Sequence, residues 1–161
     1  MLHIENISKT FFPGTINEKR ALQHLSLHLK PGDFVTVIGG NGAGKSTTIN
    51  IMCGQLAKDS GTVVIDEKNL ESDVTGIKTE LGVVFQNSVL DQALSVKENL
   101  RSRAALYGIA GEEFRKRLEE LSKMLSFEDL LKRTVGKLSG GQRRRIDIAR
   151  ALLHRPKSLI L

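Results

Sequence analysis

The sequence predicts an α/β fold in which helices flank a parallel sheet. Two short apolar runs, 34–38 and 158–161, have the composition of strands buried on both faces of such a sheet. The first run leads through glycines into a helix, which is the order of a strand, a turn and a helix. Between the runs, the pattern over residues 88–137 becomes helical, which indicates a helical insert in an α/β core.

Length, composition and charge narrow the classes of function. The 161 residues allow one compact domain or part of a larger one, and they exclude a multidomain enzyme. A hydrophobic fraction of 40% is enough to form a core, so a disordered chain is excluded. The formal charge of +6 favours an anionic partner, such as a phosphate ligand, a nucleic acid or an anionic lipid.

The single cysteine, Cys53, is typical of a protein in a reducing compartment. One cysteine cannot form an internal disulfide, so a small secreted scaffold is excluded and the cytoplasm is favoured. The N-terminus lacks a signal-peptide pattern, and no run approaches the roughly 20 apolar residues that cross a bilayer. A role at a membrane would therefore require a partner.

The N-terminal third predicts two antiparallel strands, followed by the first buried strand and a helix. Apolar and polar side chains alternate along the antiparallel pair, and turn residues at 13–15 and 31–33 mark a loop and a tight turn. We expect strands at 2–7, 22–29 and 34–38, and a helix at 46–53 that Gly54 ends.

A glycine-rich loop after the first apolar run carries the clearest chemical signal. Segment 39–47, GGNGAGKST, satisfies G-x-x-x-x-G-K-[ST] through Gly39, Gly44, Lys45 and Ser46. Glycines let backbone N–H groups turn inward around phosphate oxygens, and the following helix points its positive end at the same anion. Lys45 would reach the β- and γ-phosphates, and the Ser46 hydroxyl would bind Mg²⁺. The alternative is a turn without a ligand, but the position between strand and helix favours phosphate binding.

The middle of the chain predicts two further strands and two helices. Ser95 and Glu98 have the spacing of a capping box at the start of one helix, and Gly108 closes that helix. The next helix has an apolar stripe, with charged residues on its other faces. The two strands are expected at 62–66 and 81–85. The apolar stripe of the second helix consists of Phe114, Leu118, Leu121 and Leu125, and its charged residues are Glu113, Arg115, Lys116, Arg117, Glu119 and Glu120.

A second glycine-containing turn, 138–142 (LSGGQ), opens a helix that Pro156 ends. A Ser-Gly-Gly turn at a helix N-terminus is an anion-binding arrangement. It is also an ordinary N-cap, in which Ser139 satisfies the first helical amides, and taken alone the turn favours the cap because it has no lysine. His154, at the other end of the helix, is interpreted as a C-terminal cap.

Together these motifs resemble the nucleotide-binding domain of ABC transporters over the whole chain. Segment 39–47 resembles the Walker A loop, and Gln86 in GVVFQN resembles the Q-loop glutamine. Segment 138–142 resembles the full family signature, so at this turn the resemblance favours anion binding over a simple cap. The resemblance implies the nucleotide-binding residues Phe11, Gly39, Asn41, Gly42, Ala43, Gly44, Lys45, Ser46 and Thr47, and the signature residues Ser139, Gly140, Gly141 and Gln142.

The resemblance also implies partners and roles. Two such domains pair head to tail, so that the signature turn of one closes on the γ-phosphate held by Lys45 of the other. Ser46 and Gln86 are implied as Mg²⁺ ligands, and Gln86 also as a catalytic residue. Phe11 is implied to stack on adenine, although Phe12 competes and a packing role is the alternative. A transmembrane permease subunit would dock at the helical insert, which places the protein at the cytoplasmic face of the cell membrane.

The resemblance differs along the chain. Residues 10–50 resemble ATPase subunits of uptake systems for aromatic amino acids, whereas 80–100 and 135–156 resemble drug-exporter ATPases of the daunorubicin-resistance type. The transported substrate and the direction of transport therefore stay open.

In the family, the run at 158–161 continues into acidic residues that this sequence does not contain. They are the Walker B aspartate, which holds Mg²⁺ through water, and the catalytic glutamate. The expected fold is thus a P-loop NTPase core with an N-terminal antiparallel β-subdomain and a helical insert, the C-terminal part of the core missing. Because such sites work by positioning and charge neutralisation, we expect the 161 residues to hydrolyse ATP poorly. The expected divisions are 1–86 (ATP-binding core and β-subdomain), 87–137 (helical subdomain) and 138–161 (signature motif, helix and start of the Walker B strand).

Three functions are consistent with these expectations. The first is the energy-coupling ATPase of an ABC transporter, the second a non-catalytic nucleotide-binding module, and the third a soluble ABC ATPase of translation or repair. Nucleic acid is not expected as a partner. The arginines 143–145 begin a helix whose apolar stripe is already assigned, and one tyrosine without tryptophan offers little for base stacking.

Overall fold

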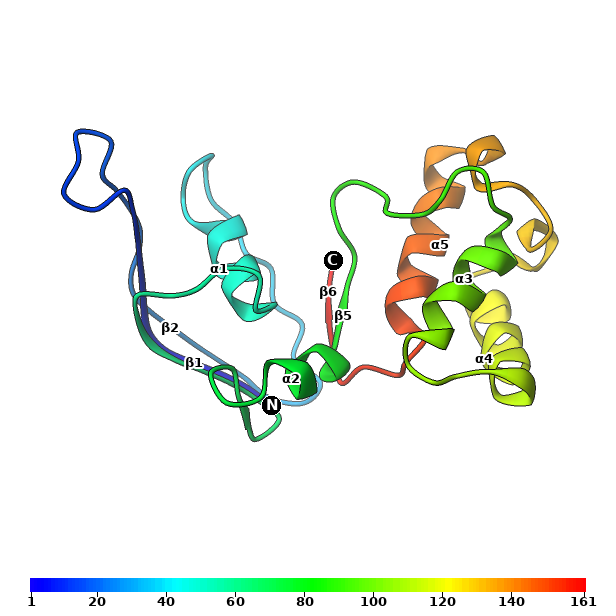
Figure 1. The fold of residues 1–161 in the computed structure, drawn as a ribbon, viewed down its shortest axis with the longest axis horizontal. Coiled ribbons are helices and arrows are strands. Elements are labelled where there is room, and N and C mark those ends of the chain that lie inside the picture. Colours follow the sequence, from blue (N-terminus) through cyan, green and yellow to red (C-terminus); the bar gives the residue numbers. More distant parts are fainter. The chain divides into compact units, whose positions relative to one another are not determined.

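The computed structural model describes residues 1–161, which fold as two compact units (Figure 1). Unit 1 is Met1–Glu80 and unit 2 is Leu81–Leu161. An antiparallel sheet in unit 1, together with a parallel strand pair and helices in unit 2, confirms the predicted α/β class. None of the helices combines the length and the apolar composition that crossing a membrane requires.

The sheet of unit 1 is antiparallel and has the order β2-β1-β3-β4. Alternation buries Leu2 and Ile4 of β1 and Val63 and Ile65 of β3, which gives the sheet one apolar face. Pairing of β1 with β2 confirms the two strands predicted near the N-terminus. The strands are β1 (Leu2–Phe11), β2 (Lys19–Leu29), β3 (Ser60–Ile65) and β4 (Lys68–Asn69).

Two helices complete unit 1. Helix α1 (Lys45–Met52) confirms the predicted helix, and Gly54 follows it with a φ of +64°, the left-handed conformation expected at a helix stop. The short helix α2 (Val74–Glu80) was not predicted. Cys53, next to the end of α1, is buried, and this burial raises the pKa of its thiol against the opposing charge of Lys78.

The buried strand predicted at 34–38 is absent, and this prediction was wrong for the structure. These residues lie in no strand, and Phe34 and Ile38 are 89% and 88% exposed. A parallel strand is stable only when neighbouring strands bond it and both faces are covered. The sheet of unit 1 does not pair with this segment, so its apolar composition alone does not make it a strand.

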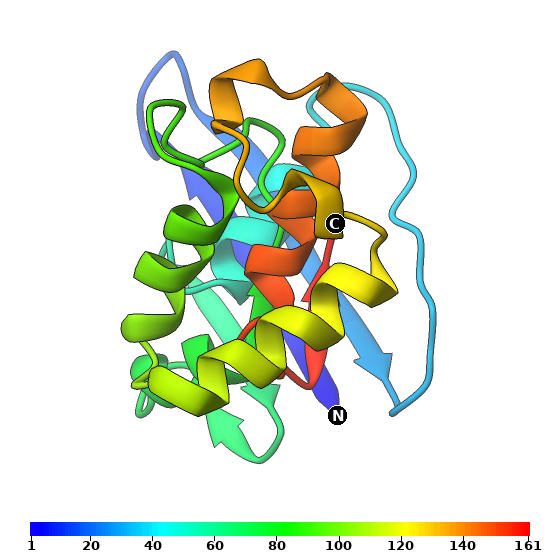
Figure 2. The same ribbon diagram turned by 90° about the vertical axis from the view of Figure 1, so that its right-hand side faces the viewer.

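Three helices and two short 3₁₀ turns make up most of unit 2 (Figure 2). The capping box of Ser95 and Glu98 starts the first of them as predicted, and the pKa of Glu98 is lowered by its bonds to the Ser95 hydroxyl and amide. The predicted stripe on α4 is confirmed, since Phe114, Leu118 and Leu121 are buried. The elements are α3 (Val96–Ala105), α4 (Gly111–Met124), η1 (Glu128–Leu130), η2 (Val135–Lys137) and α5 (Gly140–Leu152).

A parallel strand pair lies beside these helices. Strands β5 (Leu81–Val83) and β6 (Ser158–Ile160) pair in parallel, which confirms both strands, although each is shorter than predicted. The prediction that the second would be buried is wrong, because Leu159 is 39% and Leu161 63% exposed. At Gly82, a Cβ would lie 2.6 Å from the carbonyl oxygen of Ala151, so only glycine lets β5 approach α5 this closely.

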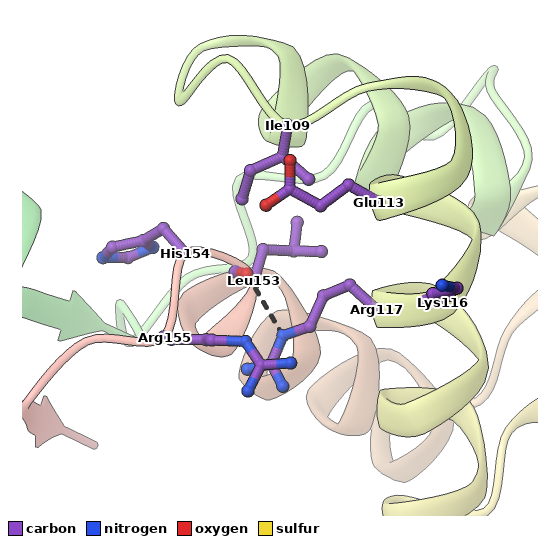
Figure 3. Close-up of a pocket in the computed structure, with 7 residues that line it drawn as sticks. All are labelled: Ile109, Glu113, Lys116, Arg117, Leu153, His154 and Arg155. Carbon is purple, nitrogen blue, oxygen red and sulfur yellow. Dashed lines mark hydrogen bonds between the residues drawn. The ribbon is translucent and has the colours of Figure 1, made fainter.

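Arg117 of α4 is buried, although the pattern placed it on a polar face. Its Nε donates to the carbonyl of Leu153 at 3.1 Å, as Figure 3 shows, and a terminal nitrogen donates to the carbonyl of Leu152. These carbonyls end α5 and have no partner inside the helix. Glu120 pairs with both Arg117 and Arg155, at 2.8 and 2.9 Å. Arg117 therefore caps α5 from the neighbouring helix.

His154 does not cap that helix, contrary to the prediction. Its Nε2 donates to the carbonyl of Leu81 at 3.1 Å, and its ring stacks on Tyr107 with 4.1 Å between centroids. The histidine thus links the end of α5 to β5 and to the turn that follows α3, while Arg117 supplies the C-terminal cap.

Candidate functional site

The glycine-rich loop of unit 1 is held against strand β2. Gly44, immediately before α1, has a φ of +87°, which side chains on L residues rarely adopt. A Cβ there would lie 2.6 Å from the carbonyl oxygen of Ala21 and 2.7 Å from Leu22 Cδ2. Gly42 also has a positive φ, of +86°. Alternating left-handed residues of this kind make a concave backbone with inward-facing N–H groups.

Helix α1 begins without any side chain to satisfy its first amides. Gly44 provides no capping bond, and the first turn contains no acidic residue. Helices α3 and α5 differ, because Ser95 and Ser139 each close a capping box at their N-termini. The first-turn N–H groups of α1 and the positive end of its dipole are therefore available to an external anion.

Lys45 lies across the loop that precedes it. Its Nζ donates to the carbonyls of Gly39 (2.6 Å) and Gly40 (2.8 Å), which holds the ammonium at the loop. Ser46 is exposed at the start of α1, whereas Thr48 is buried and donates from Oγ1 to the Gly44 carbonyl at 3.0 Å. A cation, free amides and a hydroxyl thus converge on a single short segment, as phosphate binding requires.

A second cation, Lys19, lies at the same loop and was missed by sequence reasoning. A Cβ on Gly42 would lie 3.5 Å from Lys19 Nζ, so the ammonium lies directly against that glycine. Lys19 is the residue opposite Phe11 in the β1–β2 pair. The signal that would have found it is the register of the strand pair, which places this end of the pair at the loop.

Phe11 and Phe12 occupy different environments. Phe11 is partly buried, and the Nζ of Lys9 lies 5.9 Å from its ring centroid. Lys9 is also bonded to Asp59 at 2.7 Å, and this bond is the main cause of the lowered pKa of that carboxyl. Phe12 is 66% exposed and has a φ of +53°. Phe11 is opposite Lys19 in the strand pair, and its stacking role stays a prediction.

The signature turn of unit 2, residues 138–142, forms the N-terminal helix cap that was the alternative to anion binding. Ser139 Oγ accepts from the amide of Gln142 (3.2 Å), and Gln142 Oε1 accepts from the amide of Ser139 (2.9 Å). Gly140 and Gly141 have negative φ, and a Cβ on either would meet no atom within 4 Å. Neither backbone conformation nor packing within the chain explains these two glycines.

Gln86 lies in an exposed segment after β5, also in unit 2. The guanidinium of Arg144, in α5, donates to the carbonyl of Phe85 at 2.7 Å. The structure therefore places Gln86 next to the helix that the signature turn opens.

Nothing in the chain groups three or more His, Cys, Asp or Glu side chains as a metal site. Ser46 lies in unit 1 and Gln86 in unit 2, and their role as Mg²⁺ ligands stays a prediction.

A pocket of 210 Å³ in unit 2 contains none of the predicted site residues. Figure 3 shows its lining, where Arg117 and Arg155 converge beneath Leu153. Both guanidiniums are already paired with Glu120, and Arg117 is further bound to backbone carbonyls. This pocket therefore belongs to the packing of α4 against the end of α5.

Known proteins share this fold. The sequence pattern of the ABC transporter family matches residues 22–161. The ATP-binding cassette MJ0796, solved as a dimer in a post-hydrolysis state bound to ADP and Pi, is 34% identical, with a TM-score of 0.82 over 97% of this chain and 71% of that chain. CbiO1 from Clostridium perfringens, part of the ABC transporter complex CbiONQ, is 30% identical, with a TM-score of 0.86 over 98% of this chain and 63% of that chain.

Proposed function

This chain belongs to the ABC transporter family, and from that premise we propose that it binds Mg-ATP as an energy-coupling subunit. The observation that supports nucleotide binding most directly is the uncapped start of α1 behind a glycine loop that carries Lys45. Backbone amides would hold the phosphates, Lys45 would neutralise their charge, and the Ser46 hydroxyl would face Mg²⁺. Phe11 would stack on the adenine, and the remaining loop residues Gly39, Asn41, Gly42, Ala43 and Thr47 would line the phosphates.

Replacing Lys45 tests this proposal. Lys45→Ala should weaken ATP binding by about 10- to 100-fold, since a hydrogen bond to a charged group contributes about 1.5–3 kcal/mol. Isothermal titration with Mg-ATP measures the loss. Lys97→Ala, which removes an exposed lysine of unit 2, is the matched control and should leave the affinity unchanged. Equal affinity in wild type and Lys45→Ala would contradict phosphate binding at this loop.

We further propose that a second copy of the chain completes the nucleotide site. The support comes from Gly140 and Gly141, which weaken the first turn of α5 without any conformational or packing need inside the chain. Because residues 140 and 141 have no side chains, another backbone or a phosphate can approach the start of α5 closely, even though Ser139 and Gln142 cap this helix within the chain. MJ0796 was solved as a dimer, and a head-to-tail pair would bring Ser139, Gly140, Gly141 and Gln142 of one copy to the nucleotide held by Lys45 of the other.

Gly141→Ala separates this role from folding. Alanine is a better helix former than glycine, and space is open at this position, so the variant should be more stable by up to about 1 kcal/mol in urea denaturation. Dimerisation that depends on ATP should be lost, as measured by analytical ultracentrifugation with and without Mg-ATP. A variant that is both more stable and still dimerises with ATP would argue against contact at this turn.

The wider role is proposed by analogy with the solved relatives. CbiO1 is part of a transporter complex, so we propose that this chain works with a transmembrane permease subunit at the cytoplasmic face of the cell membrane. ATP hydrolysis would then drive transport, with Gln86 positioned at Mg²⁺ or at the attacking water. Comparing ATP turnover with and without the permease in membranes tests this coupling. Equal turnover in the two cases would contradict it.

A further inference from the structure

Two hydrogen bonds tie the exposed segment around Gln86 to the signature helix. Ser88 Oγ donates to Oδ1 of Asp147 at 3.0 Å, and the guanidinium of Arg144 donates to the carbonyl of Phe85 at 2.7 Å. Arg144 and Asp147 lie three residues apart on α5, hence on the same side of the helix. The two bonds therefore bracket Gln86, one before it in the chain and one after it.

Asp147 is an unusual residue in this position. Its side chain is only 7% exposed, and burial raises the pKa of its carboxyl, with the Ser88 hydroxyl and the charges of Arg144, Arg150 and Arg143 acting in the opposite direction. No ion pair within 4 Å offsets the burial of this carboxylate, so the Ser88 hydroxyl is its direct partner. An apolar residue would fill the same place on α5 without this penalty.

The segment that Asp147 holds has few other attachments. Strand β5 ends at Val83, and the amide of Val84 makes the last bond to β6, at 2.9 Å. From Phe85 to Asn87, the bond from Arg144 is the one hydrogen bond to the rest of the protein. Loss of the α5 bonds would thus free the segment that carries Gln86 while leaving the core of unit 2 intact.

We infer that Ser88, Arg144 and Asp147 form a clamp that sets the position of Gln86 relative to the signature turn at the start of the same helix. The inference rests on the proposed nucleotide-binding function, because only then does Gln86 have a phosphate or Mg²⁺ to meet. Ser88, Arg144 and Asp147 are positioning residues, since they act through the segment and not on the nucleotide. A movement of Gln86 toward a γ-phosphate would therefore pull on α5 through the side chains of Arg144 and Asp147.

Hydrogen exchange at amides 85–90 tests the clamp in the complete chain. Asp147→Ala should speed exchange there about fivefold without nucleotide, the factor expected for one lost hydrogen bond. Ser88→Ala also removes the bond from the Leu90 amide to Ser88 Oγ, so it should speed exchange by at least as much. Asp147→Asn should restore the wild-type rate, because its amide oxygen still accepts from Ser88. Asp129→Ala, at an exposed carboxylate of the same unit, is the matched control and should change nothing. Unchanged exchange in both alanine variants would overturn the clamp.

The positioning role has its own measurement. In wild type and Asp147→Asn, Mg-ATP should protect amides 85–90 more than Mg-ADP does, and Asp147→Ala should lose this difference while its ATP affinity stays within about twofold. A difference that persists in Asp147→Ala would overturn the positioning role. If the wild type bound no ATP at all, the proposed function would fail, and the exchange rates without nucleotide would still decide whether the clamp exists.

Discussion

Gly44→Ala should destabilise the chain by about 2–5 kcal/mol and remove its ability to bind ATP. The first cause is the φ of +87°, which places an alanine in the left-handed region. The second is contact, because the new Cβ would lie 2.6 Å from the Ala21 carbonyl oxygen and 2.7 Å from Leu22 Cδ2. The loop would have to move away from β2, and the cradle of amides would move with it. Urea denaturation and titration with Mg-ATP measure the two effects.

Gly32→Ala is the matched control for the backbone part of this effect. Gly32 has a φ of +90°, but a Cβ there would meet no atom within 4 Å. The unfolding free energy of Gly32→Ala should therefore fall only by the cost of the left-handed backbone conformation, about 1–2 kcal/mol, and the variant should keep ATP binding. Equal losses for Gly32→Ala and Gly44→Ala would show that the close approach to β2 contributes nothing.

Phe127→Ala should cost about 3–5 kcal/mol of unfolding free energy, the usual range for an aromatic removed from a packed core. Phe127 is fully buried in unit 2, in the cluster that also contains Leu121, Leu130 and Ile146. The neighbouring backbone is fixed by α4 and by the turn η1, so the cavity cannot collapse fully. The measurement is urea denaturation followed by circular dichroism.

A second apolar residue of unit 2 provides the comparison for Phe127. Leu106, at the end of α3, is 75% exposed, so Leu106→Ala should change the unfolding free energy by less than about 0.5 kcal/mol. A loss near 3 kcal/mol for Leu106→Ala, or a loss below about 1 kcal/mol for Phe127→Ala, would contradict the assignment of the core.

Features that depend on neighbours in the chain were predictable from the sequence. The capping box of Ser95 and Glu98, the left-handed stop at Gly54 and the apolar stripe beginning at Phe114 all occur where the pattern placed them. Each follows from residues within a few positions of one another, whose geometry a single helix fixes.

Features that depend on distant parts of the chain were not predictable. The strand expected at 34–38 needed neighbours that composition cannot supply, and the burial of Arg117 depends on where α5 ends. The site divides in the same way. The proposed roles of Lys45 and Ser46 follow from a local motif, whereas Lys19 joins the loop only through the register between β1 and β2. The contact of Ser88 with Asp147 spans 59 residues and leaves no local trace.

The cap that Arg117 places on α5 means that both ends of this helix are held by side chains. Its 13 residues extend about 20 Å, with the Ser139 turn at one end and the guanidinium from α4 at the other. Unwinding of the last turn would break the bonds from Arg117 to the carbonyls of Leu152 and Leu153, so the cap opposes fraying at this end. The Ser139 turn therefore stands on a helix whose two ends are both capped.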